Sequence, residues 1–248
     1  MGQPIAPPPA PAAPAHKRLA RRVLKRIVAW RYRHFRLDAE PARWVRVAGW
    51  RLRIAPTVFN PGIYFTSGFL ARYLARPGVV PRGGAVLDLG TGSGIMALVA
   101  ARSGAGRVVA TDLNPRAVRC AAANVARYGL ATRVDVRAGD LFAPVAGEQF
   151  DLIVCNPPYF PGTPHTVAER ALLAGPAYEW LDRFAAGVAA HVAPGGRVLL
   201  VLGDAADLAA VLPHLAAPDA QLTQVARRDI WIEVLYLYIL TWPGGRSS

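Results

Sequence analysis

A glycine-rich segment, Asp88-Leu89-Gly90-Thr91-Gly92-Ser93-Gly94, holds the residues best suited to binding a small molecule. An apolar and β-branched run ends at Leu89, and a run with helical spacing extends from Ile95 to Ala101. This pattern predicts a strand, a tight loop and a helix. Glycines permit backbone angles closed to other residues and allow a ligand to approach the main chain, while the helix adds N–H groups and a positive dipole end. We therefore predict a nucleotide-binding turn.

The glycine spacing indicates which nucleotide is bound. A dinucleotide fold has the pattern G-x-G-x-x-G, but Ile95 occupies its last position here and the glycine falls one residue earlier, at Gly94. The segment instead resembles the first motif of the class I S-adenosylmethionine-dependent methyltransferases, whose ligand has no pyrophosphate. The resemblance implies S-adenosyl-L-methionine as the cofactor. It implies cofactor contacts from Asp88, Gly90, Thr91, Gly92, Gly94 and Ile95. An ordinary strand-to-helix turn is the alternative.

A second segment, Asn156-Pro157-Pro158-Tyr159, follows the strand predicted over 150–155. Ligands of doubly wound sheets bind beyond the carboxyl ends of the strands, so we expect it to face the same crevice. It resembles the fourth motif of methyltransferases that act on planar nitrogens, including the release-factor glutamine methyltransferases. The resemblance implies that the Asn156 side-chain and Pro157 main-chain carbonyls accept the two N–H bonds of the acceptor nitrogen. Pro157 and Pro158 would stiffen the loop, and Tyr159 would offer a ring face. The alternative is a strand-ending turn.

Two further acids follow predicted strands. Asp112 ends the second strand, where a carboxylate can accept both ribose hydroxyls of a cofactor, with Leu113 beside it. Asn114 is better placed than Asp112 to cap the helix that begins at Pro115. The family resemblance assigns Asp140 to the adenine amino group and Leu141 to the adenine ring. An Asx turn is the alternative for Asp140.

Residues 58–66 resemble the Pro-x-x-x-Thr approach of the release-factor glutamine methyltransferases, a stretch that helps to close over the cofactor. The resemblance implies a cofactor contact from Thr66. Alternatively, Thr66 or Ser67 caps the helix expected over 68–75.

The elements that must position these residues alternate regularly. Helices beginning near residues 95, 115, 178 and 205 alternate with strands predicted over 85–89, 107–111, 132–137, 150–155 and 198–202, and two paired strands over 222–226 and 230–240 follow. This order predicts an α/β fold with a Rossmann-like, doubly wound, seven-stranded sheet, mostly parallel with the last strand antiparallel. Residues 43–54 predict a β-hairpin turning at Ala48-Gly49. We expect a lead-in with a basic helix over 1–36, a cleft-lining hairpin and helix over 37–82, and the core over 83–243.

The composition of the chain restricts the other classes of protein to which it could belong. The chain has 248 residues, 53% of them apolar, which suffices for one buried domain. Its net charge of +13 is local, because residues 1–53 hold 13 Lys or Arg against two acids while residues 54–248 hold 16 against 14. The segment 17–36 predicts a basic amphipathic helix that packs on the domain, binds an acidic partner such as RNA, lies on an anionic membrane or serves as a transit peptide.

Two cysteines exclude a disulfide framework, and the scattered histidines have no metal-ligand spacing, so no metal is expected. No apolar run is long enough for a transmembrane segment, and we expect a soluble, cytoplasmic protein. Together the motifs predict an N-methyltransferase acting on a planar nitrogen, with a glutamine-type amide of a protein as the first choice of acceptor. The alternatives are an exocyclic base amine in RNA or DNA, a small-molecule amine, or an inactive cofactor-binding adaptor.

Overall fold

The computed structural model describes residues 42–243, which form a two-stranded hairpin and a seven-stranded sheet of order β5-β4-β3-β6-β7-β9-β8. The helices and strands, in chain order, are β1 (Arg43–Val47), β2 (Trp50–Ile54), α2 (Phe65–Leu74), β3 (Ala85–Leu89), α3 (Ile95–Arg102), β4 (Arg107–Asp112), α4 (Pro115–Arg127), β5 (Val134–Ala138), η1 (Ala143–Val145), β6 (Phe150–Cys155), η2 (Glu169–Ala171), α5 (Glu179–Val188), η3 (Ala189–His191), β7 (Val192–Gly203), α6 (Leu208–His214), β8 (Gln221–Asp229) and β9 (Val234–Thr241). Within the seven-stranded sheet β9 alone runs opposite to the other six strands, so the predicted fold class is confirmed. The basic helix predicted over 17–36 lies outside the described residues.

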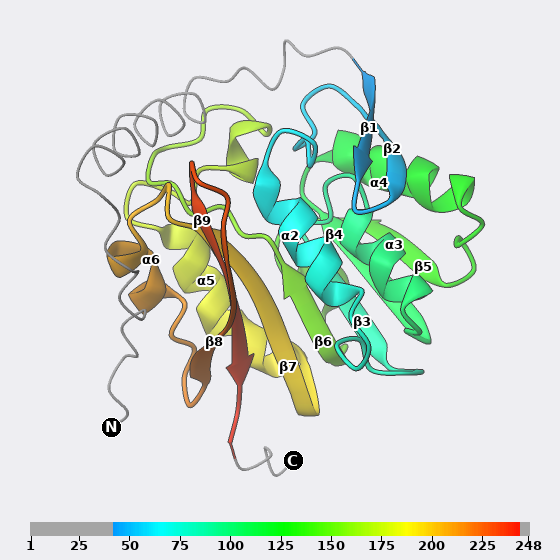
Figure 1. Cartoon of the computed structure of the whole chain (residues 1–248). Coiled ribbons are helices and arrows are strands. Elements are labelled where there is room, and N and C mark those ends of the chain that lie inside the picture. The colour runs from blue at the N-terminus through cyan, green and yellow to red at the C-terminus, as the bar shows by residue number, and fades with distance from the viewer. Residues whose placement is uncertain (1–41, 244–248) are drawn as a thin grey trace.

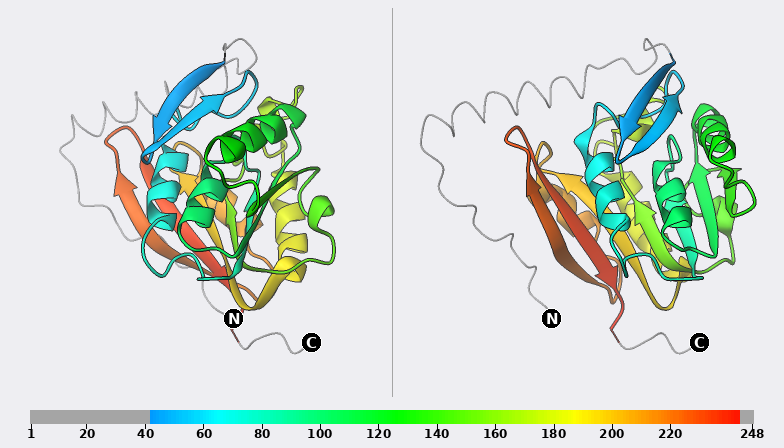
Figure 2. Two further views of the ribbon diagram at one scale, coloured as in Figure 1. Left: turned by 90° about the vertical axis from the view of Figure 1, so that its right-hand side faces the viewer. Right: turned by 45° about the vertical axis from the view of Figure 1, so that its right-hand side comes forward.

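Helices cover both faces of the sheet (Figure 1; Figure 2). Because successive residues of a strand point to opposite faces, each central strand contributes to two cores. In β3, Val86 packs in the core that α2, α3 and α4 close, whereas Leu87 and Leu89 pack in the core that α5 and α6 close. Burial on both faces explains why these strands are nearly continuous apolar runs in the sequence.

The strand order reverses at β3, which places a ligand site there. From β3 the chain proceeds to β4 and β5 on one side and then returns to β6 on the other side of β3. Ligand-binding crevices form at such switch points, beyond the carboxyl ends of the strands. The parallel register pairs Leu89 with Cys155 and also with Thr111. The residues that come next in the chain are Gly90, Asp112 and Asn156. These three residues therefore meet at one edge of the sheet.

The hairpin predicted over residues 43–54 is present. The hairpin β1–β2 turns at Ala48-Gly49, where both residues have positive φ. The helix α2 begins at Phe65, three residues earlier than expected. Within the described part of the chain, no helix is long and apolar enough to cross a membrane.

The strands β7 and β8 are longer than predicted, and each contains an irregularity. The Pro194-Gly195-Gly196 sequence indicates a turn, yet it lies inside β7, where the pairing with β6 shifts register between Phe150 and Leu152. A Cβ on Gly196 would lie 2.8 Å from the Phe150 carbonyl oxygen, so only glycine allows the close approach. The strand β8, at the end of the sheet, has a second irregularity between Gln224 and Ala226.

Candidate active site

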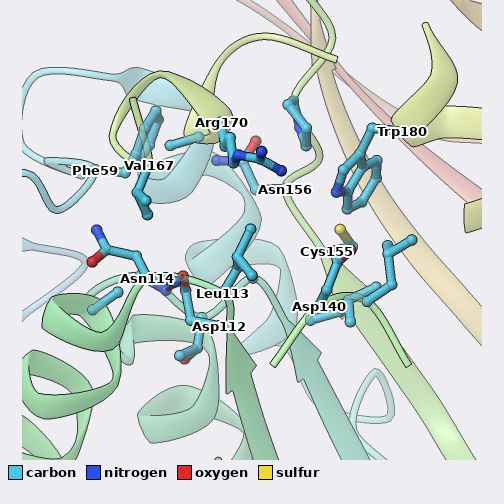
Figure 3. A pocket seen from close by; sticks show the side chains of 18 of the residues that line it. Phe59, Asp112, Leu113, Asn114, Asp140, Cys155, Asn156, Val167, Arg170 and Trp180 are labelled. Carbon is cyan, nitrogen blue, oxygen red and sulfur yellow. Dashed lines mark hydrogen bonds between the residues drawn. The ribbon is translucent and has the colours of Figure 1, made fainter. Parts of the chain in front are cut away.

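A cavity of about 330 Å³ lies at the carboxyl ends of β3, β4, β5 and β6, within the volume range of small-molecule sites. It is lined by Gly90, Thr91, Gly92, Asp112, Leu113, Asp140, Leu141, Asn156 and Pro158 of the predicted set. Figure 3 shows Asp112 and Asn114 on one side of this cavity and Asn156 and Arg170 on the other. The topology thus brings both sequence motifs to one site.

The three glycines of the loop have two different structural roles. All have positive φ, with values of 72° at Gly90, 55° at Gly92 and 86° at Gly94. Gly90 and Gly92 line the cavity, and a Cβ on either would meet no protein atom within 4 Å, so the space beside them is open to a ligand. A Cβ on Gly94 would lie 3.2 Å from Ala121 of α4, and neither Gly94 nor Ile95 lines the cavity. Both residues therefore have a role in helix packing, and their cofactor contacts stay a prediction.

Asp88 lies beneath the loop, and it does not line the cavity. Its Oδ2 accepts hydrogen bonds from Thr91 Oγ1 at 2.6 Å and from the Ala97 backbone N–H at 2.9 Å. Burial raises the pKa of Asp88 to about 7, against the lowering effect of these two bonds. This carboxyl therefore braces the loop from within the protein, and its direct contact with the cofactor stays a prediction.

Asp88→Asn is expected to flatten the pH dependence of stability. Between about pH 4 and 7 the folded protein holds the Asp88 proton that the unfolded chain has lost, so stability decreases as pH rises, by up to roughly 1.4 kcal/mol per pH unit. Asparagine keeps one oxygen for Thr91 and Ala97 and cannot ionise. Melting temperatures measured across this pH range test the effect. An identical pH profile for the variant and the wild type would contradict the burial of a titrating carboxyl.

Asp112 holds the loop and faces the cavity. Its Oδ2 accepts from the Gly92 N–H and its Oδ1 from the Asn114 N–H, both at 2.8 Å, and burial raises its pKa. Asn114 caps α4 by accepting from the Arg116 N–H at 2.9 Å, as its position before Pro115 predicts. Asp112 is therefore not needed as a cap, and each carboxylate oxygen retains a lone pair for a ligand. Leu113, 38% exposed, adds apolar surface beside it.

Asp140 and Leu141 lie in the loop that follows β5, the strand next to β4 in the sheet. Asp140 Oδ2 accepts from Arg183 of α5 at 2.6 Å, and both side chains line the cavity. A ligand amine would share this carboxylate with the arginine. Leu141 has a φ of 46°, and a Cβ on the preceding Gly139 would lie 2.4 Å from Pro144 Cγ, so the tight turn fixes the position of both predicted residues.

Asn156 is held by two hydroxyls from α2. Its Nδ2 donates to Thr66 Oγ1 and to Ser67 Oγ, each at 3.3 Å, and both hydroxyl residues are buried. Within residues 42–243 its side-chain oxygen accepts no hydrogen bond, which leaves it available to a ligand. Thr66 contacts Asn156 and does not line the main cavity, and its predicted cofactor contact stays a prediction. Neither hydroxyl side chain caps α2, contrary to the alternative prediction.

The rest of the tetrapeptide divides between two cavities. Pro158 lines both cavities, whereas Pro157 and Tyr159 line only the smaller one, together with Thr66. Tyr159 is 7% exposed, and its ring centroid lies 5.1 Å from that of Phe160. This ring therefore packs inside the protein, and the ring face that it would offer to a planar acceptor stays a prediction.

Replacing both hydroxyls, as Thr66→Val with Ser67→Ala, is expected to lower turnover by about tenfold, because two hydrogen bonds worth roughly 1 kcal/mol each no longer orient Asn156. Cofactor affinity should change little. Separate measurement of kcat and of cofactor affinity checks this. Lost affinity with normal turnover would instead support the cofactor contact predicted for Thr66.

Several cavity residues come from stretches without a recognisable motif. The loop 160–176 contributes Arg170, and α5 contributes Trp180 and Arg183. Ser67 carried only a weak signal, as a candidate helix cap. Arg170, Trp180 and Arg183 reach the cavity because of how distant segments fold together, and the local sequence pattern does not encode this.

Comparison with known proteins agrees with this geometry. The model of the family described as methyltransferase small domain matches residues 50–224. A release factor glutamine methyltransferase of Cereibacter sphaeroides is 38% identical over 168 residues, which is 63% of this chain and 58% of that protein. A ribosomal protein uL3 glutamine methyltransferase of Bradyrhizobium diazoefficiens is 36% identical over 162 residues, 61% of this chain and 50% of that protein.

Among solved structures, the E. cuniculi Mtq2–Trm112 complex, described as responsible for methylation of the eRF1 translation termination factor, has a chain 26% identical to this one. The TM-score is 0.56, and the match covers 77% of this chain and 99% of that chain. The chain spans about half the length of the curated relatives it matches. The family match covers well over half of the sequence, and the chain belongs to the methyltransferase small domain family.

Proposed function

We propose that this protein is an S-adenosylmethionine-dependent N-methyltransferase whose acceptor is the side-chain amide of a protein glutamine. One observation carries the proposal. The Asn156 amide is fixed by two buried hydroxyls beside the glycine loop, with its oxygen left available at the cavity. An asparagine oxygen held in this way is suited to orienting an N–H group for attack on a bound cofactor.

The residues of the cavity fit this cofactor. Open space beside Gly90 and Gly92 admits a ligand to the main chain, and the Asp112 carboxylate suits a pair of ribose hydroxyls. Leu113 and Leu141 provide apolar surface for an aromatic base, and Asp140 provides an acceptor for its amino group. When bound, S-adenosylmethionine supplies a methyl group on a positively charged sulfur.

The protein's own part in the reaction is to aim the acceptor nitrogen. The lone pair of an amide nitrogen is delocalised, so it attacks only when its N–H bonds are held out of the amide plane. Asn156 Oδ1 would accept one N–H, and the Pro157 main-chain oxygen would accept the other. These bonds strengthen as positive charge develops on nitrogen, which favours the transition state over the ground state. Tyr159 and Phe160, which are buried and whose rings contact each other, would keep the two prolines in place.

The names of the relatives support a glutamine acceptor, because two of them methylate glutamine in release factors or a ribosomal protein by name. An acceptor of this kind would place the enzyme in the cytoplasm. A second candidate is an exocyclic amine of an RNA base. It is favoured by Arg170, a cation lining the cavity, which could pair with the phosphate of a nucleotide.

Incubation with tritiated S-adenosylmethionine and separate protein and RNA fractions of a cell extract tests the choice. The proposal expects label in protein, recovered as methylated glutamine after complete digestion. Label confined to RNA would establish the second candidate instead. Cofactor binding without methyl transfer to either fraction would indicate an inactive, cofactor-binding adaptor. The Asn156→Ala protein serves as the control for contaminating activities.

A further inference from the structure

The outward face of the hairpin β1–β2 is basic. Along each strand the residues alternate, so Val47, Leu52 and Ile54 are buried while Trp44, Arg46, Arg51 and Arg53 are exposed. The antiparallel register pairs Trp44 with Arg53 and Arg46 with Arg51 across the two strands. Three guanidinium groups and one indole ring therefore share one surface.

The helix α4 extends this surface, because side chains of α4 and the residue after it bind the free edge of β2. Asn124 exchanges hydrogen bonds of 3.0 Å with the backbone N–H and carbonyl of Arg53. The Tyr128 hydroxyl accepts from the Arg51 N–H at 2.8 Å and donates to its carbonyl at 3.0 Å. Figures 1 and 2 show the hairpin next to α4. These bonds fix the spacing between the hairpin and the helix.

The exposed side of α4 adds three more arginines at helical spacing. We call the combined surface the arginine face; it consists of Trp44, Arg46, Arg51, Arg53, Arg116, Arg119 and Arg127. Arg116 and Arg127 are separated by about 16 Å along the helix axis. The arginine face thus presents two rows of positive charge, one on the hairpin and one on the helix.

Among residues 42–243, no acid pairs with these arginines. Neither Arg43–Ile54 nor Pro115–Arg127 contains Asp or Glu. Within residues 42–243, none of the six arginines forms an ion pair, whereas Arg107, Arg137 and Arg183 each pair with a carboxylate. Clustered like charges repel one another and destabilise the folded state, so the arrangement favours an anionic partner.

Trp44 holds two of the guanidinium groups in place. The Cζ atoms of Arg51 and Arg127 lie 4.9 Å and 4.7 Å from the centre of its ring, one contributed by each row. Cation–π contacts of this kind restrict the side chains before any partner binds. Arginines restricted in this way lose less entropy on binding, and their planar fork matches the oxygens of a phosphate.

We propose that the arginine face binds the phosphate backbone of RNA. Two rows of arginines fit a polyanion with regularly spaced charges, whereas a membrane surface would require several apolar side chains to insert, and Trp44 is the one large apolar side chain of the face. The cavity is lined by Thr57, just after β2, and by Ala117 of α4, so RNA bound here lies next to the cavity mouth. This binding does not depend on which nitrogen is methylated, and it goes beyond the proposed function.

The test removes three charges from the full-length protein in two ways. The first variant carries Arg46→Gln, Arg51→Gln and Arg53→Gln. Its matched control carries Arg76→Gln, Arg82→Gln and Arg102→Gln, exposed residues at the opposite end of the strands. Fluorescence anisotropy with a labelled single-stranded RNA of about 20 nucleotides follows binding from ~50 to ~200 mM salt, a range in which each phosphate contact adds about 0.7 to the slope.

The first variant should bind RNA about tenfold or more weakly near 100 mM salt, with a salt slope lower by about 2, while the control stays close to wild type. Equal loss in both variants would mean a general charge effect and would overturn the proposal. Wild-type RNA binding by the first variant, with transfer to a protein acceptor lost, would assign the face to an acidic protein. Arg116→Gln with Arg119→Gln, exposed on α4, replaces the hairpin variant if that variant does not fold.

Discussion

Asn156→Ala is expected to lower methyl transfer by roughly 10²–10³-fold, the loss typical of removing one preorganised polar group at a developing charge. The amide oxygen has no hydrogen-bond partner within the described residues, and its nitrogen is fixed by Thr66 and Ser67. The side chain is therefore oriented for a bond made most strongly in the transition state. Steady-state kinetics on the identified acceptor, with calorimetry for the cofactor, measure the two effects separately.

Cofactor affinity of the Asn156→Ala protein should remain close to that of wild type, since the proposed cofactor contacts come from Gly90, Gly92, Asp112 and Asp140. Wild-type turnover would refute the mechanism. Lost affinity with a folded protein would mean that Asn156 shapes the cofactor pocket instead. Thr66→Val with Ser67→Ala completes the comparison, because it changes the orientation of Asn156 and leaves its oxygen in place.

Asp112→Ala is expected to weaken S-adenosylmethionine binding by roughly tenfold or more. Two charge-assisted hydrogen bonds to ribose hydroxyls, each worth about 1.5–3 kcal/mol, would be lost, and the Gly92 and Asn114 N–H groups would lose their acceptor. Burial raises the pKa of Asp112, so wild-type affinity should also decrease on acidification, at a higher pH than for an exposed aspartate. Isothermal calorimetry across pH checks both effects.

Asp135→Ala is the matched control for the change in net charge. Asp135 lies on β5, half-exposed, and pairs with Arg137 outside the cavity. Its removal should leave cofactor affinity unchanged. If the two variants bind the cofactor equally well, the ribose assignment of Asp112 is wrong.

The sequence predicts the strands and loops that form the site, because these elements depend on local sequence patterns. Apolar runs such as 85–89 and 150–155 identify buried parallel strands, and parallel strands bring their carboxyl ends to one edge. The positions of Gly90, Asp112 and Asn156 follow from this alone. The sequence also shows that Asn114, before Pro115, is the better helix cap, and the structure confirms it.

The same patterns do not show which residues of a motif pack against other parts of the protein. Asp88, Gly94 and Tyr159 belong to the motifs, yet their contacts are with Ala97, Ala121 and Phe160 inside the protein. Whether a motif side chain points outward or inward is set by the packing of helices from distant parts of the chain. Thr66 and Asn156 are 90 residues apart, and no spacing in the sequence links them.

The loop 160–176 is the hardest part to infer. It returns across the strand ends through two isolated bridges, Phe160 with Leu173 and Gly162 with Gly175. Such pairings involve one residue on each side and leave no periodic pattern. The cavity residues that this loop supplies, Arg170 among them, are consequently known from the structure alone.

The irregularity in β8 has a consequence for how the molecule avoids self-association. In the described sheet β8 is an edge strand of nine residues, long enough to template pairing with another chain. The register passes from Gln224 to Ala226, so Val225 has no partner on β9, and Arg227 and Arg228 follow directly. A bulge and adjacent positive charges both disfavour edge-to-edge pairing, which protects this edge of the sheet against aggregation.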